Sequence, residues 1–210
     1  MSSNDLPATI SRQNFRKGKF RIELGKAALL VIDMQRYFLQ KDSHAYLKHG
    51  EAAIKNVNLL ISRFRSIYTP VIFTRHMHPH GKDPGMLGKW WKDVMYEGDV
   101  LIELDPRMDR AEGDIEIRKD RYDAFLGTGL LDALKSKGVT QIVITGVMTD
   151  LCCETTARSA FCRDYEVFII HDATGTTTRA LHIHALATLA HGFAVILSTK
   201  EALAQAGVKA

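Results

Sequence analysis

The pattern of apolar and polar positions divides the chain into short apolar runs separated by longer segments of helical periodicity. The apolar runs, each typical of a buried β-strand, lie at residues 27–32, 70–74, 115–117, 141–145, 167–170 and 193–197. Apolar positions three or four residues apart predict helices at 51–67, 125–137, 151–163 and 178–190. Because strands alternate with helices, we predict an α/β fold: a three-layer α/β/α sandwich with a six-stranded, mainly parallel, doubly wound sheet of Rossmann-like type.

Chain length and composition are those of one globular domain. The 210 residues include 46% hydrophobic and 25% charged residues, which is enough apolar material for a substantial core. We expect residues 1–25 to form an N-terminal arm and residues 26–210 a single domain. The segment 76–114 interrupts the alternation, carries Trp90 and Trp91, and is long enough to be a functional loop or lid.

Cysteine usage, charge and hydropathy exclude several classes of protein. Three cysteines crowd into residues 152–162, an odd number in one short stretch, which favours reduced thiols over a disulfide framework. The apolar runs are far shorter than the about 18 residues of a membrane helix, and the first residues lack the pattern of a secretory signal. The net charge of +4 includes a basic cluster at 12–21, which no base-stacking aromatic motif accompanies. We therefore expect a cytoplasmic protein that binds neither nucleic acid nor membranes.

Three reactive side chains are predicted at one edge of the sheet, on neighbouring strands. Asp33 ends the first strand, Lys119 follows the third, and Cys152 lies just after the fourth. In an open α/β sheet, ligands bind outside the carboxyl ends of the strands, so the carboxylate, ammonium and thiol would face one pocket. Taken singly, each has an ordinary explanation: a capping aspartate, a surface lysine and a buried packing cysteine. Their common edge favours nucleophilic catalysis by Cys152.

The position of Cys152 predicts how its thiol behaves. In the first turn of the helix predicted at 151–163, free backbone N–H groups and the helix dipole would stabilise a thiolate. Cys153 is turned by about 100° around the helix, so it should not share the pocket, and Cys162 should lie in the core. The carboxylate of Asp33 emerges beside apolar neighbours, a setting suited to a general base.

Three segments resemble the signature blocks of the isochorismatase-like cysteine hydrolase family, which includes relatives of nicotinamidase and N-carbamoylsarcosine amidohydrolase. They are LLVIDMQRYFL (29–39), RKDRYDAFLGTGL (118–130) and VITGVMTDLCCETTARSAF (143–161), in the family's order. The resemblance extends over roughly residues 25–200 and implies the family's fold. It places the family's catalytic aspartate, lysine and cysteine at Asp33, Lys119 and Cys152.

The resemblance also implies a reaction on a small amide. Asp33 would accept the proton of Cys152, and the sulfur would attack the carbonyl carbon to form a thioester, which water hydrolyses while Lys119 stabilises charge. The backbone N–H groups of Met148 and Cys152 would form the oxyanion hole, beside a cis Val147–Met148 peptide bond. Members of the family usually assemble as homodimers or homotetramers, and we expect the same here.

Departures from the family pattern leave alternatives open. Metal-binding members carry an aspartate and histidines after the second strand, where this chain has His76, His78 and His80. Three imidazoles could approach zinc, but without the carboxylate we expect no metal, and no glycine-rich phosphate loop indicates another cofactor. The stretch DMQRYFL resembles true isochorismatases, which hydrolyse a vinyl ether and lack the cysteine; isochorismatase is the runner-up function. A non-enzymatic thiol redox or binding protein, using Cys152 and Cys153, is the third.

Residues that contact the substrate are predicted only from their positions near the catalytic edge. Aromatic side chains would form walls of the pocket, and an arginine would bind a substrate carboxylate through two hydrogen bonds. The candidates are Gln35, Phe38, Arg75, His78, Trp90 and Tyr122. Nicotinamide, carbamoyl compounds, ureido acids and maleamate all remain possible substrates at this point.

Overall fold

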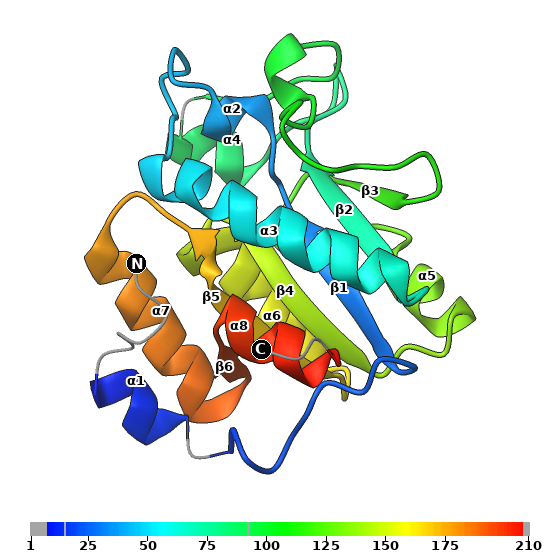
Figure 1. The fold of residues 1–210 in the computed structure, drawn as a ribbon. Helices are drawn as coiled ribbons and strands as arrows, with labels where there is room; N and C mark the ends of the chain where they lie inside the picture. The colour runs from blue at the N-terminus through cyan, green and yellow to red at the C-terminus, as the bar shows by residue number, and fades with distance from the viewer. Residues whose placement is uncertain (1–7, 15, 92, 208–210) are drawn as a thin grey trace.

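A six-stranded sheet forms the centre of the computed structural model, which describes residues 8–14, 16–91 and 93–207 (Figure 1). The strands are β1 (Ala27–Ile32), β2 (Val71–His76), β3 (Ile115–Lys119), β4 (Gln141–Val147), β5 (Glu166–Gly175) and β6 (Val195–Leu197). They are ordered β3–β2–β1–β4–β5–β6, and every neighbouring pair is parallel. The predicted fold class is confirmed, with a sheet that is parallel throughout.

Helices form the two outer layers. One face of the sheet is covered by α2 (Arg36–Leu39), α3 (Lys48–Ser66) and α8 (Thr199–Gln205), and Figure 1 shows α3 crossing this face. The other face is covered by α1 (Ala8–Gln13), α5 (Leu130–Ser136), α6 (Glu154–Phe161) and α7 (Arg179–Gly192). Three short elements complete the fold: α4 (Met86–Trp91), the 3₁₀ helix η1 (Val100–Ile102) and the π-helix η2 (Thr149–Cys153).

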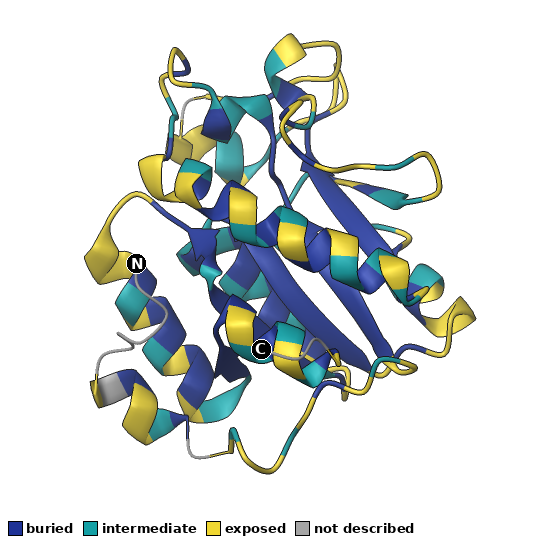
Figure 2. Cartoon of the chain, viewed as in Figure 1, coloured by how far each residue is buried: buried dark blue, intermediate teal, exposed yellow. Residues whose placement is uncertain are grey.

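Successive strand residues supply a hydrophobic core on each side of the sheet, because side chains alternate between the two faces. In β1, Leu30 packs into the core beneath α5, α6 and α7, whereas Val31 packs beneath α3. Figure 2 shows the sheet buried throughout its centre and the exposed residues on the outward faces of the helices. Among the described helices, none combines the length and hydrophobicity that crossing a bilayer requires.

The described part of the N-terminal arm packs into the main body of the fold. Ile10 of α1 is fully buried in the core shared with α7. The side chain of Asn14 donates to the carbonyl oxygen of Ile196 (2.7 Å) and accepts from its N–H (3.1 Å). Its amide group thus pairs with the edge of β6 in the way that a neighbouring strand would. Residues 1–7 and 15 of the predicted arm, and 208–210 of the predicted domain, lie outside the described residues.

Several element boundaries differ from the prediction for identifiable reasons. Helix α5 begins at Leu130 rather than at 125, because Gly127 has a positive φ of +68° and a turn occupies the residues before it. Strand β5 continues to Gly175 although residues 171–174 interrupt its apolar run. Helix α8 was not predicted, yet Ser198 and Glu201 form a capping box at its start, a signal that the sequence does contain.

Gly146, in β4, occupies a position with no room for a side chain. Its φ is +108°, and a Cβ atom there would lie 2.0 Å from the carbonyl oxygen of Ile32 in β1. We expect Gly146→Ala to lower the free energy of unfolding by at least about 2 kcal/mol, because β1 and β4 must separate to admit the methyl group. Gly127→Ala is the matched control, since Gly127 also has a positive φ but open space around it. Equal losses in chemical denaturation would contradict the crowding argument.

Candidate active site

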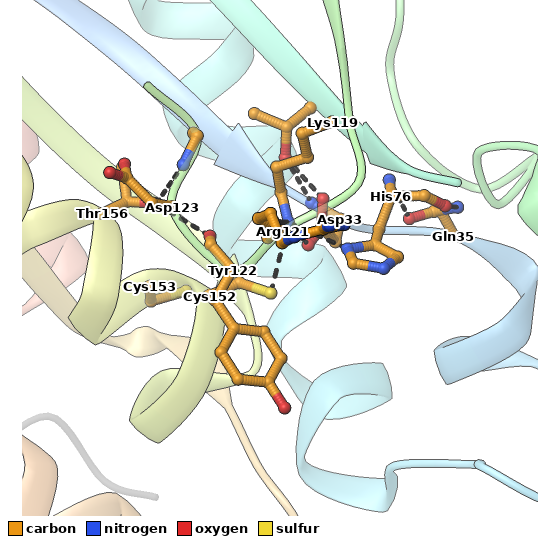
Figure 3. A network of polar contacts seen from close by, with 12 residues as sticks. Asp33, Gln35, His76, Lys119, Arg121, Tyr122, Asp123, Cys152, Cys153 and Thr156 are labelled. Atoms are coloured by element: carbon orange, nitrogen blue, oxygen red, sulfur yellow. Dashed lines mark hydrogen bonds and ion pairs between the residues drawn. The ribbon is translucent and has the colours of Figure 1, made fainter. Parts of the chain in front are cut away.

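The structure brings Asp33, Lys119 and Cys152 together at the carboxyl edge of the sheet (Figure 3). Nζ of Lys119 lies 2.7 Å from Oδ2 of Asp33 and 3.3 Å from Sγ of Cys152. Asp33 is fully buried, Lys119 is 3% exposed and Cys152 is 6% exposed. A buried ion pair therefore contacts the thiol of a cysteine that is itself almost fully buried.

A turn at the end of β1 and a hydroxyl on β2 position the carboxylate of Asp33. The backbone of Asp33 has a φ of +47°, in the left-handed region. Its N–H donates to Oγ1 of Thr74 (3.1 Å), and the Thr74 hydroxyl donates to Oδ1 of Asp33 (2.6 Å). One carboxylate oxygen thus accepts from Thr74, and the other faces the ammonium of Lys119.

Lys119 reaches the site from β3, which is not next to β1. Strand β2 lies between them, and His76 of β2 is directly opposite Lys119. The ammonium passes beside His76, with Nζ 3.3 Å from its Nδ1, and donates to the carbonyl oxygen of Arg121 (3.0 Å). The prediction of neighbouring strands was wrong for Lys119, and the length of the lysine side chain closes the gap.

Cys152 lies in η2, a turn of π-helix between β4 and α6, rather than in the first turn of a regular α-helix. The Val147–Met148 peptide bond just before η2 is cis. The N–H groups of Leu151 and Cys153 both donate to the carbonyl oxygen of Met148, at 3.2 and 3.1 Å. These bonds fix the backbone on either side of Cys152, so the position of its sulfur is set by the backbone of the turn.

The other two cysteines occupy different environments. Cys153 is fully buried, and its Sγ lies 4.0 Å from the carbonyl oxygen of Thr145 in the core beneath α6. Cys162 is exposed at the C-terminal end of α6, so its predicted core position was wrong. The reason is that α6 ends at Phe161, so Cys162 follows the helix and its side chain does not face the sheet. All three thiols are free.

The charges of the site favour an uncharged thiol at rest. Burial raises the pKa of Cys152 to about 12; the ammonium of Lys119 opposes the rise and the carboxylate of Asp33 adds to it. Burial alone would lower the pKa of Lys119, but the interactions with Asp33 and Cys152 together outweigh it, and the pKa is raised. Burial therefore outweighs the stabilisation of a thiolate expected at a helix start, because ionising the thiol would leave a net negative charge in a buried site whose ion pair is already neutral.

His76 acts as a neutral hydrogen-bond acceptor for Lys119. Burial, together with the charge of Lys119, lowers the pKa of His76 to about 3. The imidazole is uncharged near neutral pH, so its Nδ1 can accept a hydrogen bond from the ammonium. This contact, with those to Asp33 and Arg121, holds the ammonium beside the sulfur of Cys152.

The raised pKa of Cys152 predicts a distinctive pH dependence of alkylation. In a Cys153→Ala background, iodoacetamide should modify Cys152 at a rate that rises about tenfold per pH unit between about pH 7 and pH 10. The reason is that the thiolate fraction keeps growing below a pKa of about 12. Tandem mass spectrometry separates this adduct from one on Cys162. A rate that levels off below about pH 9 would contradict the assignment.

Potential metal ligands converge at one place among the described residues, and it is the candidate active site itself. Ligand atoms of Asp33, His76 and Cys152 all lie within 4.8 Å of one another. The ammonium of Lys119, however, contacts each of these three side chains. A divalent cation there would stand against a fixed positive charge. This donor set does not fit a catalytic zinc ion.

The three histidines considered as zinc ligands do not converge. His80 is exposed and stacks on Tyr96, with ring centroids 5.4 Å apart, and His76 is engaged by Lys119. His78 is 1% exposed, its ring lies 5.2 Å from that of His76, and neither of its nitrogens has a hydrogen-bond partner in the described chain. His78 therefore remains a candidate for substrate contact rather than for a metal.

Gln35 and Arg75 are committed to the protein itself. The amide of Gln35 donates to the carbonyl oxygens of His76 and Ile102 and accepts from the N–H of His76, which ties the ends of β1 and β2 together. Arg75 follows Thr74 and thus points to the opposite face of the sheet, where it pairs with Glu103 (2.7 Å) and Glu116 (2.8 Å). The structure does not place either side chain for substrate contact.

The aromatic candidates differ in their distance from the thiol. Figure 3 shows the ring of Tyr122 extending past Cys152, and its hydroxyl accepts from Nε1 of Trp91 (2.5 Å). Trp90 is 73% exposed, and Phe38 packs among core residues. The long polar segment therefore reaches the site through Trp91, one of the two tryptophans that the sequence analysis placed in it.

Sequence reasoning missed the supporting role of Thr74 and assigned His76 to a different one. Thr74 lies two residues before His76, the last residue of β2, so the alternation of a strand places both on one face. Thr74 orients Asp33 and His76 contacts Lys119. Two polar side chains on one face of an otherwise apolar strand were the available signal.

Comparison with known proteins is consistent with this geometry. The model of the Isochorismatase domain family matches residues 27–201. A protein named Nicotinamidase 3 from Arabidopsis thaliana is 39% identical over 176 residues, covering 81% of this chain and 84% of that protein. A probable inactive nicotinamidase from the same plant is 34% identical, covering 74% and 83%. The solved structure of a cysteine hydrolase from Pseudomonas syringae pv. phaseolicola 1448A superposes with a TM-score of 0.86 at 24% identity, covering 90% and 95%. The chain thus belongs to the isochorismatase domain family of hydrolases.

Proposed function

We propose that this chain is a cysteine-dependent hydrolase that cleaves the C–N bond of a small amide through a thioester intermediate. The observation that carries the proposal is the contact of the Cys152 sulfur with the buried Lys119–Asp33 pair. A nucleophile needs a base within reach and a fixed positive charge, whereas a packing cysteine needs neither. The relative named Nicotinamidase 3 supports amide chemistry, and the intact triad argues that this chain is active.

The first half of the reaction forms the thioester. Sγ of Cys152 bonds to the carbonyl carbon while its proton moves to the Asp33 carboxylate, and the carbonyl electron pair moves onto oxygen. When the tetrahedral intermediate collapses, the C–N bond breaks and the leaving nitrogen takes the proton from Asp33. The products are a thioester on Cys152 and ammonia or an amine. Lys119 keeps its proton and lowers the cost of the developing negative charge.

The second half regenerates the thiol. A water molecule bonds to the thioester carbon while one of its protons moves to Asp33. The C–S bond then breaks, and this proton passes to the sulfur of Cys152, which releases a carboxylic acid. Backbone N–H groups of Met148 and Cys152 are proposed to bind the oxyanion in both halves, since the cis peptide bond turns the backbone immediately before the nucleophile.

An ammonia-release assay over a panel of small amides tests the proposal, beginning with nicotinamide and including ureido acids and carbamoyl compounds. We expect turnover of at least one amide, and rapid acid quenching should yield an acylated chain whose mass increase matches the acyl group on Cys152. Pyruvate release from isochorismate, with no ammonia from any amide, would instead establish vinyl-ether hydrolysis and overturn the proposal.

We further propose that the protein works in the cytoplasm as a homodimer or homotetramer, with a small amide as its partner molecule and no cofactor. The three free thiols support a reducing compartment. Exposed Met86, Trp90 and Val100, each at least 60% exposed, supply apolar surface of the kind that subunit contacts bury. Sedimentation analysis at micromolar concentration should show an assembly larger than one chain.

A further inference from the structure

Away from the candidate active site, a second site of interest is a cavity of about 190 Å³ at the carboxyl end of β5, between the first half of α3 and the start of α7. Asp33, Lys119 and Cys152 do not line it. Its wall instead includes three histidines and one arginine: His49 from α3, His171 from β5, and Arg179 and His182 from α7. The proposed amide hydrolysis makes no use of this group of residues.

An irregularity in β5 creates one wall of the cavity. Ile144 of β4 is opposite Ile169, but Gly146 is opposite Thr174, so five steps along β5 match two steps along β4. The extra residues include His171, whose carbonyl oxygen accepts from the hydroxyl of Thr174 (3.4 Å). Such bulges redirect side chains, and this one brings an imidazole to the carboxyl edge of the sheet.

Two side chains in this wall lack the partners that their chemistry demands. His171 is 4% exposed, and its Nε2 has no hydrogen-bond partner in the described chain. Arg179 is exposed and, among the described residues, makes no ion pair or side-chain hydrogen bond. The acidic side chain nearby, Asp172, is directed elsewhere: its Oδ1 accepts from the N–H and the hydroxyl of Thr199, at 2.7 and 2.8 Å. The unpaired guanidinium of Arg179, beside an imidazole nitrogen that can donate in one tautomer, favours an anionic ligand.

The spacing of these groups indicates a polyatomic anion rather than a metal ion. Among the described residues, the only set of three metal-ligand side chains within mutual reach is the one at the catalytic site. The histidines of the second cavity are therefore too far apart to share one ion, whereas an oxyanion can accept from several separated donors. Burial also lowers the pKa of His182 to about 4, so Arg179 and the N-terminal end of α7 supply the positive potential.

The cavity contacts the segment that carries the nucleophile. Nδ1 of His182 lies 2.9 Å from Oγ1 of Thr149, the first residue of η2. On the opposite wall, Gly50 follows His49 and lies so close to Val147 that a Cβ atom would be 3.0 Å from its side chain. The two walls therefore contact Val147 and Thr149, at the start of the stretch that leads to Cys152.

We propose that this cavity binds a small oxyanion, either phosphate or a short carboxylate, through Arg179 and His171, and that the bound ion, lying against His182, restrains the η2 turn that His182 contacts. Phosphate and succinate both carry negatively charged oxygen atoms that can accept hydrogen bonds, and they serve as the two probes. Whichever raises the unfolding temperature at the lower concentration identifies the natural class of ligand.

Thermal unfolding of the full chain tests the binding, with potassium chloride at matched ionic strength as the salt control. We expect at least one probe to raise the unfolding temperature by a few degrees in the wild type. The gain should be lost in Arg179→Gln, recovered in part in Arg179→Lys, and kept in Arg12→Gln, which removes one exposed charge from α1. No gain with either probe, the same gain in Arg179→Gln, or an equal gain from chloride would overturn the proposal.

Alkylation of Cys152 tests the restraint of η2 without any assumption about the substrate. The effective probe should slow iodoacetamide labelling of Cys152 at least twofold in the wild type and leave the rate unchanged in Arg179→Gln. An unchanged rate in a wild-type protein that binds the probe would overturn the restraint of η2. Because neither readout depends on turnover, failure of this proposal can be told apart from failure of the proposed amide hydrolysis.

Discussion

Cys152→Ala is expected to abolish amide hydrolysis while leaving the fold intact, with kcat/KM falling by about 10⁴-fold or more. The sulfur forms the covalent bond in the proposed reaction, and neither Asp33 nor Lys119 can replace it. The substitution removes one atom from a turn whose backbone is held by its own hydrogen bonds, so far-ultraviolet circular dichroism should not change. Initial rates of ammonia release with the best amide of the panel provide the measurement.

Cys153→Ala is the matched control for this experiment. It makes the same chemical change one residue further along, at a fully buried side chain in the core beneath α6. We expect a loss of about 1 kcal/mol in the free energy of unfolding and retention of most of the turnover. If Cys153→Ala lost activity and Cys152→Ala kept it, the nucleophile would be Cys153 and the proposed mechanism would be wrong.

Lys119→Met is expected to cost both activity and stability. The ammonium is the ionic partner of a fully buried carboxylate, and removing one member of a buried ion pair typically costs about 3–5 kcal/mol. Turnover should also fall, because the positive charge beside the sulfur of Cys152 is lost. Urea denaturation measures the first effect, and ammonia release under folding conditions measures the second.

A double-mutant cycle separates the ion pair from the packing of the lysine chain. Asp33→Asn combined with Lys119→Met should be less destabilising than the sum of the two single changes, since no unpaired charge is left behind. Lys137→Met, at an exposed lysine after α5, should change stability by no more than about 0.5 kcal/mol. Strict additivity in the cycle would contradict the view that Asp33 and Lys119 stabilise one another.

The hydrophobic pattern predicted the larger part of the fold, because a strand buried on both faces of a parallel sheet must be apolar along its whole length. A strand such as β1, covered on both faces, must be apolar at every position, and residues 27–32 are. Elements whose ends depend on turns were less predictable. The start of α5 is delayed by the conformation at Gly127, and the bulge in β5 places His171 where a simple strand would not.

The sequence by itself determined which residues are candidates for the chemistry, since Asp33, Lys119 and Cys152 follow strand ends in the order of three resembling motifs. Only the tertiary structure decided which of these side chains are charged and which neighbouring residues hold them in place. The pKa of the thiol depends on burial and on the charges of Asp33, after β1, and Lys119, in β3. The distances from these charges to the sulfur are set by the strand order, in which β2 lies between β1 and β3. Electrostatic energy depends on separation in space, and spacing along the chain does not specify it.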